Sequence, residues 1–159
     1  MNRTHRITTI VLALAAASGF AIAGVGAPWW SMPDVSIGPM YSAQCFGGEC
    51  QRASLDWVGG SGSWARFGVA AWGAGLIAAL CLAALAAAIA SKRRGALIAK
   101  MVIAAAVAAT GAGVLFVSSF PGVPGMSISF GVYLYFGAVL LAVAAAVVTL
   151  RGARTAVPA

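Results

Sequence analysis

Long apolar segments alternate with shorter polar ones along the whole chain. The apolar segments cover residues 7–27, 67–90, 96–120 and 127–150. Each has about the 20 residues that a helix needs to cross a hydrocarbon layer of roughly 30 Å. The pattern therefore predicts one domain, residues 1–159, built as an all-α membrane protein with a bundle of four transmembrane helices.

The longest polar segment, residues 28–66, separates the first two predicted helices and holds every acidic residue of the chain. At its centre two adjacent glycines lie between two cysteines, in the order Cys45, Phe46, Gly47, Gly48, Glu49 and Cys50. Glycines readily adopt the positive φ angles of a two-residue hairpin turn. Such a turn makes the cysteines a non-hydrogen-bonded pair, with Cα atoms about 4.5 Å apart. We therefore predict a disulfide between Cys45 and Cys50, in a small sheet formed from residues 35–37, 41–46 and 49–53.

Charged residues are few and unevenly distributed. They make up 8% of the chain, against about 25% in soluble domains. The net charge of +7 comes mostly from cations at one end of the apolar segments. Seven flank the segments, namely Arg3, Arg6, Lys92, Arg93, Arg94, Arg151 and Arg154, and Lys100 lies just inside the third. The long loop holds only Arg52 and Arg66 beside its three acids. By the positive-inside rule, both termini are cytoplasmic and the loop is extracellular, which argues against a nucleic-acid role and for a multi-pass protein of a plasma or bacterial inner membrane.

The first apolar segment has a second interpretation. Arg3 and Arg6, a following apolar stretch and the small residues Ala21 and Ala23 also fit a signal peptide with its cleavage site. We favour a retained helix, because the apolar run exceeds the usual signal-peptide core of about 7 to 15 residues. Either alternative leaves the long loop outside.

The predicted helices contain few ionisable or metal-binding side chains. They contain no acidic residue, and the one histidine, His5, precedes the first of them. Proton relays and ion-coupled transporters normally need ionisable groups within the membrane, and a metal site needs several ligands. We therefore expect no enzyme activity, no metal and no cofactor. Small residues suit close helix contacts, and the candidates are Gly68, Gly73, Gly75, Gly111 and Gly113.

The order of these features resembles the claudin superfamily, which includes peripheral myelin protein and the calcium-channel gamma subunits. Pro28-Trp29-Trp30 is similar to the Pro-x-Trp motif that ends the first helix in that superfamily. Tyr41, Cys45 and Cys50 take the places of its loop Trp and two Cys residues, and Gly131 with Leu134-Tyr135-Phe136-Gly137 resembles the opening of its fourth helix. The resemblance implies four helices, cytoplasmic termini and a disulfide-linked extracellular sheet.

A folded exterior without catalytic groups suggests that the loop binds another protein, either a second copy or a larger membrane complex. Aromatic side chains dominate interface energetics, so the predicted contact residues are Trp29, Trp30, Tyr41, Phe46 and Trp57. One alternative is a pore or paracellular-type barrier, with Asp34, Glu49 and Asp56 as a charged lining. Another is a subunit that binds lipid or quinone between its helices, near Trp72, Tyr133 and Tyr135.

Overall fold

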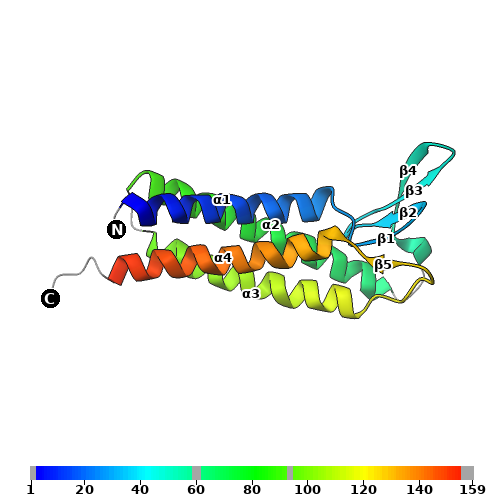
Figure 1. The fold of residues 1–159 in the computed structure, drawn as a ribbon. Helices are drawn as coiled ribbons and strands as arrows, with labels where there is room; N and C mark the ends of the chain where they lie inside the picture. Colours follow the sequence, from blue (N-terminus) through cyan, green and yellow to red (C-terminus); the bar gives the residue numbers. More distant parts are fainter. Residues whose placement is uncertain (1–2, 59–61, 93–94, 155–159) are drawn as a thin grey trace.

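Within residues 3–58, 62–92 and 95–154, which the computed structural model describes, four long helices run antiparallel with a small sheet at one end (Figure 1). The helices are α1 (Arg3–Val25), α2 (Gly62–Ala90), α3 (Ala96–Ser118) and α4 (Phe130–Arg154). All four are long and apolar enough to cross a membrane, which is compatible with a multi-pass membrane protein. The start of α1 and the end of α4 lie opposite the sheet (Figure 1), so we name the two ends of the bundle the terminal end and the sheet end.

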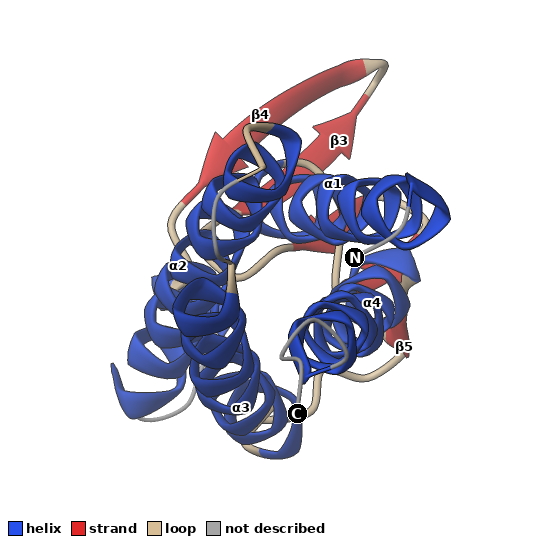
Figure 2. Ribbon diagram, turned by 90° about the vertical axis from the view of Figure 1, so that its left-hand side faces the viewer, coloured by secondary structure: helices blue, strands red, loops and turns tan. Residues whose placement is uncertain are grey.

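Each helix packs against its neighbours in a closed ring. Viewed from the terminal end, α1 lies beside α2 and α4, and α3 closes the ring between α2 and α4 (Figure 2). Three of the glycines predicted at helix contacts occupy tight positions. A Cβ at Gly68 would overlap the carbonyl oxygen of Pro39, and one at Gly75 or Gly113 would press on the ring of Tyr135. Gly73 and Gly111 have no such neighbour within 4 Å in the described part of the chain, so the packing requires a small residue at three of the five predicted positions.

The helix bounds differ from the predicted ones at both ends of the bundle. At the terminal end α1 begins at Arg3, before the predicted residue 7, and α4 ends at Arg154, after the predicted residue 150. α1 ends at Val25, before Pro28, since the residue preceding a proline is unfavourable in a helix. α2 begins at Gly62 and so includes Trp64, whose buried indole donates a hydrogen bond to the carbonyl oxygen of Phe116. α4 begins at Phe130, because the residues before it belong to a strand.

The described residues form one antiparallel sheet of five short strands. They are β1 (Trp30–Met32), β2 (Val35–Ile37), β3 (Ser42–Phe46), β4 (Glu49–Ala53) and β5 (Ser127–Ile128), in the order β4-β3-β2-β1-β5. The strands near 35–37, 41–46 and 49–53 were predicted, whereas β1 and β5 were not. Since β5 comes from the short connection between α3 and α4, both connections at the sheet end contribute to one sheet.

A cluster of aromatic side chains joins the sheet to all four helices. The ring of Trp30 in β1 stacks on Phe120 with centroids 4.4 Å apart, and Trp64 of α2 stacks on Phe116 of α3. Trp29 contacts Tyr135 of α4, which in turn meets Phe20 of α1 edge-on. Buried aromatic pairs contribute beyond the area that they bury. The sheet is therefore anchored on the bundle by packed rings.

Candidate functional site

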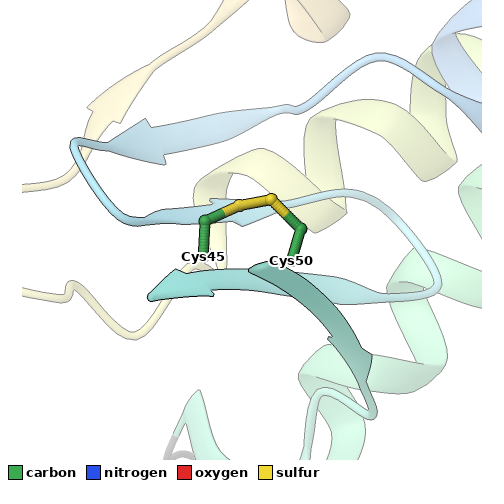
Figure 3. The surroundings of a disulfide bond; sticks show 2 residues. All are labelled: Cys45 and Cys50. Carbon is green, nitrogen blue, oxygen red and sulfur yellow. A yellow bond between two sulfur atoms is a disulfide. The ribbon is translucent and has the colours of Figure 1, made fainter. Parts of the chain in front are cut away.

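The β3–β4 hairpin has the predicted register. Gly47 and Gly48 have φ angles of 60° and 89°, and the partners on either side of the turn are Phe46 with Glu49 and Cys45 with Cys50. A disulfide joins the two cysteines, with their Cα atoms 4.0 Å apart (Figure 3). The separation is slightly shorter than the expected 4.5 Å. The local pattern of two glycines between two cysteines thus correctly predicted the turn, the register and the covalent link.

One face of the sheet changes from buried to exposed along its length. Side chains directly opposite each other in an antiparallel pair share a face, and alternate residues of a strand share it too. Near the bundle this face carries the buried side chains of Trp30, Ile37 and Ser42. The hairpin extends past the helix ends (Figure 1), and the same face continues there as Gln44, Phe46, Glu49 and Gln51, which we name the overhanging face.

The overhanging face is apolar at one position and polar around it. Phe46 is 67% exposed although it is a large aromatic residue on a strand. A hollow beside it is lined by Gln44, Phe46, Glu49, Gln51, Arg52 and Ala53. Every residue of β4 is exposed, and β4 is an edge strand. An exposed aromatic ring therefore lies close to free backbone groups and side-chain amides.

Two contacts fix the base of the hairpin. The indole nitrogen of Trp57, in the 3₁₀ turn η1 (Asp56–Val58), donates a hydrogen bond to Ser42 Oγ at 2.7 Å. Ser42 Oγ donates in turn to the carbonyl oxygen of Ser54 at 3.1 Å. On the opposite face the guanidinium of Arg52 lies over the ring of Tyr41, 4.7 Å from its centroid. Trp57 and Tyr41 therefore hold β3 and β4 together, and Trp57 also keeps 40% of its surface exposed.

Two of the five predicted contact residues lie inside the protein. Trp29 and Trp30 are 0% and 3% exposed, so their rings do not face the surroundings of the bundle. The Trp29 indole nitrogen donates to the carbonyl oxygen of Ala23 at 2.9 Å, which satisfies its one polar group. The sequence could not indicate this orientation, because a Pro-Trp-Trp run after an apolar helix is equally compatible with rings at the membrane surface.

The predicted acidic set is spread over three elements. Asp34 lies in the turn between β1 and β2, Glu49 in β4 and Asp56 in η1, and all three are exposed. The backbone of Asp34 accepts a hydrogen bond from the amide of Cys45, and the carboxylate of Asp56 accepts one from Ser54. Glu49 alone borders the hollow on the overhanging face.

The three residues considered for a ligand between helices occupy different environments. Tyr135 is buried, and its hydroxyl lies 2.9 Å from the carbonyl oxygen of Ala71 and 3.1 Å from that of Ala109. Tyr133 is 68% exposed, while Trp72 is half-buried against Gly24. The hydroxyl of Tyr135 is therefore engaged by α2 and α3 rather than directed toward an open site.

In comparisons with known proteins, no protein-family model matches the chain, and no curated protein sequence matches it. Among the described residues, no group of three or more His, Cys, Asp or Glu side chains is placed to hold a metal ion.

Proposed function

We propose that this chain is a multi-pass membrane protein without enzymatic activity, whose β3–β4 hairpin binds another protein on the non-cytoplasmic side. The partner is a second copy or a component of a larger membrane complex. The observation that carries the proposal is the exposed ring of Phe46 on a strand whose pairing is fixed by a disulfide. Covering a large apolar side chain that is held rigidly in water lowers the free energy, and this favours binding of a partner.

The surroundings of Phe46 support a protein partner. Interface centres typically combine an aromatic anchor with a rim of polar groups that remain hydrated or form hydrogen bonds. Gln44, Glu49 and Gln51 provide such a rim on the overhanging face. The free edge of β4 adds main-chain donors and acceptors that an extended segment can pair with. Trp57 contacts the base of the hairpin and is a second partly exposed aromatic side chain there.

The orientation in the membrane is proposed from charge. Arg3, Lys92 and Arg151 belong to the terminal end, whereas the acids Asp34 and Glu49 belong to the sheet end. Cytoplasmic segments of membrane proteins carry an excess of Lys and Arg, so we place the terminal end in the cytoplasm. The sheet then lies in an oxidising compartment, where a disulfide persists.

Membership of the claudin superfamily remains a proposal based on sequence motifs and element order. The supporting features are the Pro28-Trp29-Trp30 motif after the first helix and the cysteine pair in the first loop. A small sheet that carries the disulfide at one end of a four-helix bundle also supports this proposal. Among the properties that this resemblance implies, the hairpin best supports binding to another protein.

Photo-crosslinking in the native membrane tests the proposed partner site. Phe46 is replaced by the photoreactive residue benzoylphenylalanine, and a second variant carries the same group at Tyr133, which is 68% exposed on α4. We expect a discrete crosslinked protein band from position 46 and none from position 133. Recovery of only the monomer from position 46, or the same band from both positions, would refute the hairpin as the binding surface.

A substitution series provides an independent test. Phe46→Ser should weaken the complex at least tenfold, because an aromatic anchor at an interface centre contributes about 2 kcal/mol or more. Met40→Ser is the matched control, since Met40 is also exposed in the first loop but lies outside the overhanging face. The affinity is measured by titrating the captured partner. Equal losses in the two variants would indicate a general effect of the loop and not a site at Phe46.

A further inference from the structure

The charged side chains at the terminal end of the bundle are all positive, and they have no role in the proposed binding by the hairpin. The described side chains of Arg3, Arg6, Lys92, Lys100 and Arg151 belong to this end. All three acids of the chain lie at the opposite end, in the first loop. Such a separation produces a strong positive potential over the terminal end.

Contacts between the helix ends place these cations around one rim. A terminal guanidinium nitrogen of Arg6 in α1 donates to the carbonyl oxygen of Ala90 at 3.1 Å, two residues before Lys92. Gly95, just before α3, is so close to α4 that an added Cβ would lie 3.5 Å from Thr149 Cγ2. Arg151 follows Thr149 by two residues. The start of α1, the end of α2, the start of α3 and the end of α4 therefore adjoin one another.

Within this rim, Arg6 differs from the other cations. Its guanidinium also reaches the carbonyl oxygen of Ile89 and so caps the end of α2, and its side chain is half-buried. The remaining described cations are exposed: Arg3, Lys92, Lys100 and Arg151. Arg6 thus has a structural role, and the other four are available to a ligand.

The exposed cations lie beside exposed apolar side chains. Lys100 has Leu97 and Met101 as neighbours on α3, and these are 72% and 52% exposed. Ile7, one turn after Arg3 on α1, is 53% exposed. A phospholipid matches this pairing, because its acyl chains cover apolar side chains while its phosphate meets the cation. Nucleic acid and soluble phosphate have no acyl chains that could cover the exposed apolar side chains.

We propose that the terminal end selectively binds anionic phospholipids, with Lys92, Lys100 and Arg151 as headgroup contacts. The stem of Lys100 follows the apolar helix surface and carries its ammonium group to the headgroup level. Cations near an anionic leaflet each strengthen binding by about fivefold. The inference depends on the proposed membrane placement but not on the hairpin's binding partner.

Lipid competition on the full-length protein tests this assignment. The protein, purified in a neutral detergent, is mixed with equal amounts of phosphatidylglycerol and phosphatidylcholine, and retained lipids are counted by native mass spectrometry. We expect phosphatidylglycerol to dominate. In the combination Lys92→Gln, Lys100→Gln and Arg151→Gln, its excess should fall at least tenfold. The matched control, Arg52→Gln with Arg66→Gln at the sheet end, should retain the excess.

Several outcomes would overturn the proposal. They are equal retention of the two lipids, an equal loss in the sheet-end control, and displacement of phosphatidylglycerol by excess inorganic phosphate or by duplex DNA. Arg6→Gln should lower thermal stability while leaving the lipid ratio unchanged. Recovery of the protein from the soluble fraction without detergent would refute the membrane placement as well. A missing crosslink at Phe46 would refute only the partner site, so the failures are distinguishable.

Discussion

The amide nitrogen of Gly131 donates a hydrogen bond to the carbonyl oxygen of Pro28 at 2.7 Å. The first turn of α4 therefore lies directly against the chain that leaves α1. A Cβ at Gly131 would lie 2.6 Å from that oxygen and 2.7 Å from Trp29 Cδ1. Neither neighbour can easily move, because one is backbone and the other is a buried ring.

Gly131→Ala should accordingly destabilise the bundle. Overpacking of a closely packed site costs about 1–3 kcal/mol. The matched control is Gly137→Ala in the same helix. Among the described residues, no heavy atom outside the adjoining helix backbone would be within 4 Å of the new Cβ, so the stability should stay the same or rise. Thermal unfolding in detergent, followed by circular dichroism, compares the two variants. Equal shifts would show that the Pro28 contact does not restrict position 131.

The hydroxyl of Tyr135 joins three helices, since it lies within hydrogen-bonding distance of carbonyl oxygens in α2 and α3. Tyr135→Phe should reduce the free energy of unfolding by about 0.5–1.5 kcal/mol. The loss is moderate because both carbonyl groups belong to helices and keep their helical partners. Tyr133→Phe, at a 68% exposed position, should have little effect in the same unfolding assay. A Tyr135→Phe protein as stable as the parent would contradict this role.

Local patterns predicted much of this fold. Apolar segments of membrane-spanning length predicted the helices, and the glycine pair between Cys45 and Cys50 predicted the hairpin register. Both features are encoded within a few neighbouring residues, so their interpretation needs no knowledge of distant contacts.

Features that depend on pairing between distant segments were missed. β1 and β5 contain three and two residues, and they pair across nearly a hundred positions, as between Trp30 and Ile128. Neither strand has enough residues for an alternating pattern to be recognised. The burial of Trp29 and Trp30 likewise depends on Phe116 in the last turn of α3 and on Phe120 just after that helix. A useful signal was present in the sequence: aromatic residues recur where each apolar segment meets the sheet end.

Removal of the disulfide should loosen the hairpin and leave the bundle intact. The link between Cys45 and Cys50 closes a short loop on the part of the sheet that extends past the helices. In Cys45→Ala with Cys50→Ala, local opening of β3 and β4 should become easier by about 2 kcal/mol. Hydrogen exchange of the β4 amides, compared with those in α2 and α3, measures this difference.

The matched control for the disulfide is Cys81→Ala, which removes a thiol that forms no disulfide from the half-buried face of α2. It should leave hydrogen exchange in the hairpin unchanged. If the double variant instead lowered the unfolding temperature of the bundle as a whole, the hairpin and helices would form one cooperative unit. The prediction that the hairpin opens independently of the helices would then be wrong.

The backbone of Lys92 has a positive φ angle of 57° at the end of α2, where its amide donates to the carbonyl oxygen of Ile89. This left-handed conformation is unfavourable by roughly 1–2 kcal/mol for a residue with a Cβ, whereas glycine adopts it readily. Lys92→Gly should therefore stabilise the protein by about 1 kcal/mol, since the greater freedom of glycine in the unfolded chain offsets part of the gain. Lys92→Gln removes the same charge but keeps the Cβ, so the difference between the two variants isolates the backbone effect. Thermal unfolding of both in detergent provides the measurement, and a glycine variant no more stable than the glutamine variant would contradict the strain at position 92.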